Sequence, residues 1–107
     1  MVEQRTIREW KKRFEYILIV EVQVSENDVC IGYYKRPTDS IIDLCSKELN
    51  LNGLATSMDF LANNTWLGGD HRQQIVAEIA VSAQVSLWSQ MQYILNKPSG
   101  SEIKKNG

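Results

Sequence analysis

The chain has few of the residues from which small proteins build covalent cross-links, metal sites or active sites. Its 107 residues include only two cysteines and one histidine. Cys30 and Cys45 are too few for a disulfide scaffold, and they lack the C-x-x-C spacing of a metal or redox site. We expect both to be buried, reduced thiols, and a single bridge between them stays open as the alternative.

His71, the only histidine, has no neighbour at metal-ligand spacing. A nucleophilic triad would also need it as the base, and neither cysteine pairs with it in sequence. No G-x-G-x-x-G or Walker pattern occurs. We therefore predict no catalytic, cofactor-binding or metal residues, and we do not expect an enzyme.

Net charge is also nearly absent, since 12 basic residues stand against 13 acidic ones. Such a balance lacks the global electrostatic signature of a nucleic-acid or membrane binder. No apolar run approaches the roughly 20 residues that cross a bilayer, and the N-terminus is charged where a signal peptide would be apolar. We expect a cytoplasmic protein without a membrane partner. One domain over residues 1–97 and a flexible polar tail over residues 98–107 are expected.

The first part of the chain predicts a short helix and a β-hairpin. Over residues 3–14, apolar residues recur at steps of three and four, and a basic face lies opposite them. Alternating β-branched residues over 16–24 and 29–35 predict two strands around a polar turn. The basic face consists of Arg5, Arg8, Lys12 and Arg13. It is a candidate nucleic-acid face, but two interspersed glutamates favour a solvated helix surface.

Three further helices are predicted. The first starts at Thr38 or Asp39 and ends near Gly53, the second covers residues 54–66, and the third covers residues 71–95. The expected buried positions of the first two are Ile41, Ile42, Leu44, Cys45, Leu49, Leu54, Met58, Leu61, Ala62 and Thr65. Those of the third are Ile75, Val76, Ile79, Ala80, Ala83, Leu87, Met91, Ile94 and Leu95. The predicted fold class is α+β: an antiparallel β-hairpin packed on about three helices, with a short N-terminal helix.

The sequence Thr65-Trp66-Leu67-Gly68-Gly69-Asp70 opens the third of these helices. Asp70 and Gln73 have the spacing of a capping box, and the two glycines allow a sharp turn before it. The alternative is an anion site at the helix N-terminus. Because the Asp70 carboxylate would occupy the same N–H groups and repel an anion, we favour a structural turn.

Tryptophan is abundant for so short a chain, and it is enriched at binding hot spots. Trp88 lies at the edge of the apolar stripe and is expected to be half exposed. The candidate partner-binding residues are Trp66, Gly68, Gly69, Asp70 and Trp88. The alternative is that these tryptophans, together with Trp10, belong to the core.

Four segments stand out in order along the chain. They are Arg8-Glu9-Trp10-Lys11-Lys12-Arg13-Phe14, Val20-Glu21-Val22, Tyr33-Tyr34-Lys35-Arg36-Pro37 and Asn64-Thr65-Trp66-Leu67-Gly68-Gly69-Asp70. In this order they resemble small proteins of bacteriophage and prophage tail modules, especially from Bacteroidetes-type hosts, which look like tail assembly chaperones. Such proteins carry a β-bearing N-terminal part before helices and coat the tape-measure protein while the tail tube polymerises. The chain departs from them after Asp70, where they tend to run acidic and His71-Arg72 follow here.

The resemblance implies a non-catalytic protein–protein interaction protein of phage tail or virion assembly, with no cofactor. Its partner would be a protein such as a tape-measure-like protein, in the host cytoplasm or in the virion. The unpaired edges of a hairpin also suggest a homo-oligomer. Two alternatives stay open: a small nucleic-acid-binding regulator that uses the basic N-terminal helix, and an oligomeric scaffold unrelated to phages.

Overall fold

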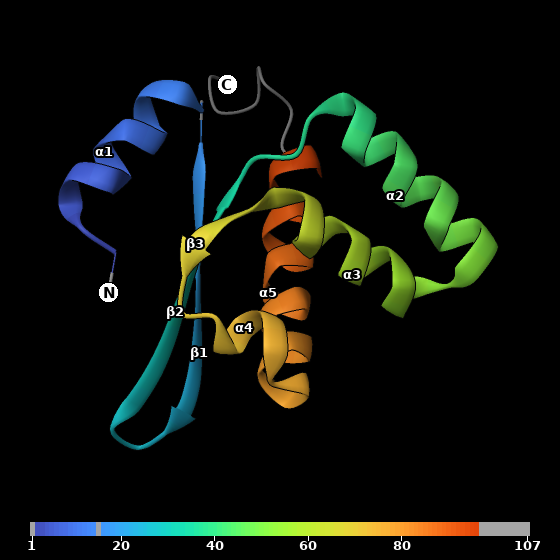
Figure 1. Cartoon of the computed structure of the whole chain (residues 1–107). Coiled ribbons are helices and arrows are strands. Elements are labelled where there is room, and N and C mark those ends of the chain that lie inside the picture. Colours follow the sequence, from blue (N-terminus) through green and yellow to red (C-terminus); the bar gives the residue numbers. More distant parts are fainter. Residues whose placement is uncertain (1, 15, 97–107) are drawn as a thin grey trace, which may run out of the picture.

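The computed structural model describes residues 2–14 and 16–96, the last three by their backbone alone. The predicted tail, residues 98–107, lies outside the described residues. Along the described chain, helices and strands follow in the order shown in Figure 1. Their bounds are α1 (Gln4–Arg13), β1 (Ile17–Ser25), β2 (Asp28–Lys35), α2 (Asp39–Asn52), α3 (Leu54–Thr65), β3 (Trp66–Gly69), α4 (Arg72–Ile75) and α5 (Ala77–Asn96). None of the described helices combines the length and apolar character needed to span a membrane.

The sheet has three antiparallel strands in the order β1-β2-β3. β1 and β2 form the predicted hairpin, with Ile17 opposite Lys35 at its open end. β3 was not predicted and pairs with β2, where Gly32 stands opposite Gly69. The protein is α+β as predicted, and its sheet contains one strand more than the expected hairpin.

The two faces of the sheet are covered by different helices (Figure 1). α5 packs along β1 and α4 packs on β2, whereas the Trp10 ring of α1 lies 5.6 Å from the ring of Tyr33 on the opposite face. Because side chains alternate along a strand, one set of β1 and β2 residues is buried under α5. The buried apolar core consists of Leu18, Val20, Val22, Cys30, Tyr34, Cys45, Leu61, Ile79, Ala83, Leu87 and Met91.

The predicted single helix over residues 71–95 is wrong, since the chain forms two helices there. Val76 interrupts them with extended angles (φ −95°, ψ 112°). α4 packs on β2 and α5 on β1, so the break lets the chain change direction between the two strands. Ile75 was expected to be buried and is 77% exposed, and Val76 is also exposed. The predicted burial of Ile79, Ala83, Leu87 and Met91 is confirmed, and the side chains of Ile94 and Leu95 lie outside the described residues.

α2 and α3 form a helical hairpin that projects from the sheet, and we call it the arm (Figure 1). Thr38 is the N-cap of α2, and its hydroxyl accepts a hydrogen bond from the backbone N–H of Ile41 at 3.3 Å. Gly53 joins the two helices with φ +93°, a conformation that suits glycine. Between them, the buried Ser57 hydroxyl donates to the Cys45 carbonyl at 2.7 Å.

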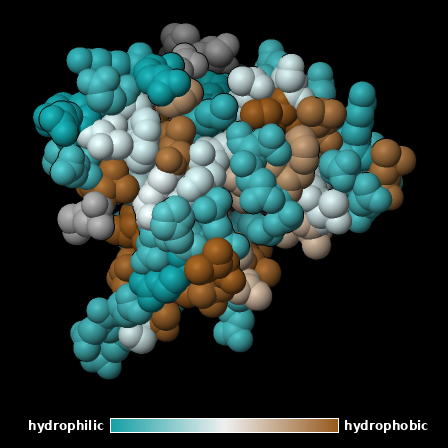
Figure 2. Space-filling view, in the orientation of Figure 1, coloured by the Kyte–Doolittle hydropathy of each residue, from teal (hydrophilic) through white to brown (hydrophobic). Residues whose placement is uncertain are grey.

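The predicted buried stripe of the arm is wrong at several positions. Cys45 is buried, but Leu44 is 45% exposed and Leu49 40% exposed. Leu54 was also expected to be buried and is 49% exposed, beside Leu51 at 77%. The physical reason is that α2 packs mainly against α3, so no sheet face covers its outer side. Figure 2 shows hydrophobic side chains at the outer end of this arm.

Candidate functional site

Strand β3 lies where the sequence analysis placed its main candidate site. The half-buried Trp66 packs its ring edge-on against Tyr34, with the ring centroids 5.3 Å apart and the planes at 77°. A Cβ atom on Gly68 would lie 3.0 Å from the indole of Trp10, so this glycine lets α1 approach the strand. Trp66 and Gly68 are thus used within the fold, which favours the structural interpretation of this stretch. Their role in partner binding stays a prediction.

Gly69 shows why two glycines end this strand. Its φ is +126°, and a Cβ atom there would lie 2.5 Å from the backbone carbonyl oxygen of Ile31. Next to it, the backbone N–H of Asp70 donates to the same Ile31 carbonyl at 2.8 Å. The glycine therefore permits close pairing with β2, and its proposed contact with a partner is untested.

The predicted capping box of Asp70 and Gln73 is wrong, because Asp70 binds Arg72 instead. Its Oδ1 accepts from the backbone N–H of Arg72 at 3.0 Å, and its Oδ2 accepts from Nη2 of Arg72 at 2.7 Å. Nη1 of Arg72 donates to Oδ2 of Asp28 at 2.7 Å. These hydrogen bonds from Arg72 hold the pKa of Asp70 and that of Asp28 below their usual range. One guanidinium thus fastens the start of β2 to the segment after β3.

Gln73, assigned to the helix cap by the sequence, is buried beneath the sheet with 3% of its surface exposed. Its Nε2 donates to the carbonyls of Val20 at 2.9 Å and Cys30 at 3.1 Å, and its Oε1 accepts from the Tyr34 hydroxyl at 2.7 Å. A Cβ atom on Gly32 would collide with this amide. Burial raises the pKa of Tyr34 to about 12. The sequence carried no local signal for this cluster, because its members come from three separate elements.

Trp88, the remaining partner-binding candidate, lies on α5 and is separated in sequence from the other candidates on and after β3. It is half-buried, as expected, and packs against the core. Val85 precedes it by three residues and Val81 precedes Val85 by four, and these valines are 49% and 55% exposed. Residues at such spacings share one face of a helix. We call Val81, Val85 and Trp88 the α5 ridge; the two valines were missed because only the buried stripe was sought.

The candidate nucleic-acid face lies on α1. Arg5, Arg8 and Lys12 are exposed, and Figure 2 shows a largely hydrophilic surface over this helix. Arg13 sits at the end of α1, where its guanidinium carbon lies 5.3 Å from the centroid of the Phe14 ring. The structure therefore keeps the four predicted basic residues together on one short helix.

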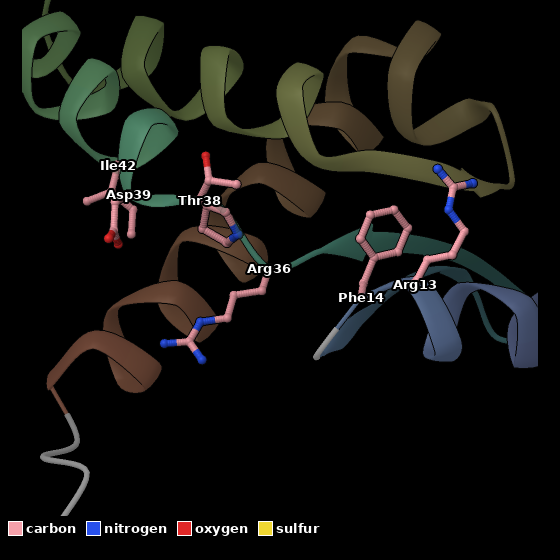
Figure 3. Close-up of a pocket in the computed structure, with 7 residues that line it drawn as sticks. Arg13, Phe14, Arg36, Thr38, Asp39 and Ile42 are labelled. Atoms are coloured by element: carbon pink, nitrogen blue, oxygen red, sulfur yellow. The ribbon is translucent and has the colours of Figure 1, made fainter.

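Two more basic residues, one at the end of β2 and one directly after it, lie close to Arg13. The sequence did not predict this grouping. Lys35 Nζ lies 5.8 Å from the Phe14 ring centroid, and the Arg36 guanidinium carbon lies 5.1 Å from that of Tyr16. Arg13, Phe14 and Arg36 line a cavity of about 440 Å³ (Figure 3). The two guanidinium groups point in different directions in this view. They therefore do not converge on a single anion.

The residues that suggest chemistry are dispersed. Cys30 and Cys45 are buried free thiols, and burial raises the pKa of both. His71 is exposed, and its Nδ1 lies 3.4 Å from Oε1 of Gln74. Within the part of the chain that the structure describes, no three His, Cys, Asp or Glu side chains are grouped to hold a metal ion. That the protein has no catalytic or cofactor-binding residues stays a prediction.

Comparison with known proteins adds no family, because neither protein-family models, nor curated proteins, nor solved structures contain a match to this chain.

Proposed function

We propose that this protein is a non-catalytic protein–protein interaction protein of phage tail or virion assembly, similar in role to a tail assembly chaperone. The resemblance of the four sequence segments supports the setting. The observation that carries an interaction role is the exposed apolar surface. Thirteen large hydrophobic residues are exposed among the described residues, against eleven in the buried core. Scattered apolar residues are normal on a protein surface, whereas a contiguous group such as the α5 ridge marks an interaction site.

The α5 ridge is the surface that best fits a long helical partner such as a tape-measure-like protein. Val81, Val85 and Trp88 lie along one face of a 20-residue helix, and helices pack through such rows of side chains. The tryptophan is anchored in the core and presents its remaining surface beside two exposed valines. A rigid aromatic residue flanked by apolar neighbours is the usual composition of a binding hot spot.

The experiment is co-expression with the open reading frames that neighbour the gene for this chain, followed by affinity purification of any complex with a long helical partner. We expect co-purification of the two proteins, and we expect Val81→Ser with Val85→Ser to weaken binding roughly tenfold or more. The matched control is Leu44→Ser with Leu51→Ser, which removes comparable exposed apolar surface from the arm and should leave this complex intact. Failure to co-purify, or equal loss in both variants, would contradict the assignment of the ridge.

A second candidate function, nucleic-acid binding, is favoured by the cluster of Arg13, Lys35 and Arg36 around two aromatic rings. Basic grooves that carry aromatic residues bind single strands. If this function holds, the purified protein retards single-stranded DNA or RNA, and its affinity falls steeply with salt because bound phosphates release counterions. Binding that is absent at about 0.1 M salt would exclude this candidate.

A further inference from the structure

Opposite charges are concentrated on two separate parts of the surface. α1 contains five basic residues and one acidic residue, whereas the arm contains four acidic residues and one basic residue. Arg8, Lys11 and Lys12 are exposed and form no ion pair with any residue that the structure describes. The two regions therefore have net charges of +4 and −3, which nearly cancel, and the whole chain has a net charge of −1. The charge is separated within the molecule instead of being in excess.

An apolar groove runs beside the basic helix. Val2, Gln4 and Ile7 line one side of it, and Val29, Ile31 and Tyr33 of β2 line the other, with Gly69 and Asp70 completing a space of about 420 Å³. The Asp70 carboxylate is already paired with Arg72. Val29 remains 42% exposed. The sheet face under α1 is therefore only partly covered, and its uncovered part borders α1, the helix that carries the basic residues.

The arm carries the complementary combination. Leu44 and Leu51 are seven residues apart on α2, so they lie on the same side of the helix, and both are exposed. Asp43 forms no ion pair or hydrogen bond with any described residue, and Glu48 accepts only from Asn52 at 3.0 Å. Apolar and acidic side chains thus stand together on the arm, as apolar and basic ones do at the groove.

We propose that the arm of one copy docks on α1 and the adjoining groove of a second copy, so that copies join head to tail. Contacts between two arms, or between two α1 helices, would place like charges together and are disfavoured. The two docking surfaces differ, so the contact is heterologous and repeats from copy to copy. Such contacts build rings when the rotation closes and open filaments when it does not. The α5 ridge takes no part, so this inference is independent of the proposed tape-measure contact.

Light scattering on the full chain gives the first test. The monomer has a mass of 12.3 kDa. We expect the weight-average mass to rise with protein concentration at about 0.1 M salt, roughly doubling or more, and to return to the monomer value at about 1 M salt, where the screening length is near 3 Å. A monomer mass at every concentration in low salt would overturn the proposal.

Charge reversal gives the decisive test. Arg8→Glu with Lys12→Glu, and separately Asp43→Lys with Glu48→Lys, should each leave the protein monomeric. Mixing these two variants should restore association, because the unaltered arm of the first variant can dock on the unaltered α1 of the second, and the acidic α1 of the first can face the basic arm of the second. Circular dichroism and thermal unfolding of each variant confirm that it is folded, which is expected since Arg8, Lys12 and Asp43 are exposed and the partly buried Glu48 hydrogen-bonds, among the described residues, only to Asn52.

The matched control replaces exposed acidic residues outside the arm, by Glu26→Lys with Glu78→Lys, and gives the same net charge as the arm variant. On its own, this control should associate as the wild type does, because both docking surfaces are unchanged. A loss of association in this control equal to that in the arm variant would overturn the proposal, as would a mass increase that nuclease treatment removes. If self-association is lost in the arm variant while the tape-measure-like complex survives, the two surfaces are separate, as we propose. Loss of that complex alone would contradict the proposed function and leave this inference intact.

Discussion

Replacing the buried Gln73 by methionine is expected to be among the most destabilising single changes in the sheet region. Methionine keeps an unbranched side chain of similar length, so the loss is mainly polar. The amide makes three buried hydrogen bonds, to Val20, Cys30 and Tyr34. At about 1 kcal/mol for each such bond, Gln73→Met should lower the free energy of unfolding by about 3 kcal/mol. For a domain of this size that corresponds to a fall in Tm of roughly 10–20 °C.

A double-mutant cycle with Tyr34→Phe separates this cause from a packing defect. Tyr34→Phe alone should cost about 1–2 kcal/mol, because it removes the hydroxyl that donates to Gln73. In Gln73→Met the Tyr34 hydroxyl is left buried without that partner, so removing it should cost nothing further. We expect the double variant to be as stable as Gln73→Met or more so, a departure from additivity of about 1–2 kcal/mol in urea unfolding. Additive losses would refute the reasoning, as would a loss as small as that of the exposed neighbour control Gln74→Met, expected within about 0.5 kcal/mol.

The same cluster makes an alkaline prediction. Burial raises the pKa of Tyr34 to about 12, against about 10 for an exposed phenol in the unfolded chain. Between these values the unfolded state loses a proton that the folded state retains, so stability should fall as pH rises from about 10 to about 12. Comparing the wild type with Tyr34→Phe isolates this effect from other groups that titrate in the same range. An equal pH slope in both proteins would contradict the assignment.

Two further predictions concern the segment around β3. Arg72→Met should lower Tm at neutral pH, and the difference from wild type should shrink below about pH 4. The reason is that the folded-state pKa of both paired carboxyls is depressed, so their contribution to stability is lost when they are protonated. A difference in Tm that persists unchanged in acid would exclude the ion pair as its source. Gly69→Ala should cost about 2–4 kcal/mol in urea unfolding, since the residue has φ +126° and its Cβ would meet the Ile31 carbonyl. Gly53→Ala, with φ +93° and open space around its Cβ, is the control: it carries backbone strain of about 1–3 kcal/mol without a clash and should cost less than Gly69→Ala.

Local patterning was sufficient for the parts of the fold whose contacts are near in sequence. The alternation in β1 and β2 predicted the hairpin, and the four-residue steps from Ile79 to Met91 predicted the buried side of α5. β3 could not be predicted in this way. It has four residues, and two of them are glycine, a residue depleted in strands. It forms a strand because its backbone pairs with the edge of β2 that β1 leaves free.

The candidate site was harder to predict because its features depend on distant residues. Arg72 and Asp28 are 44 positions apart, and no spacing rule connects them. Gln73 has ordinary capping-box spacing, so a local rule gave a plausible but wrong role. Periodicity identified apolar faces on α2 but could not show that no layer lies over Leu44 and Leu51. Exposure is a property of the assembled fold, so the exposed apolar residues of the ridge and the arm could be identified only from the structure.

The groups that hold the sheet together are distinct from the surfaces proposed to bind partners. Gln73 is buried and bonded to two strands, whereas Leu51 on the arm and Val81 on the ridge are more than half exposed. Truncating such exposed side chains removes little buried surface, so their effect on Tm should be small. Partner binding that fails while Tm is unchanged can then be assigned to the altered surface. A Gln73 variant would instead lower Tm first and lose every interaction together, because all three surfaces depend on the same sheet and helices for their positions.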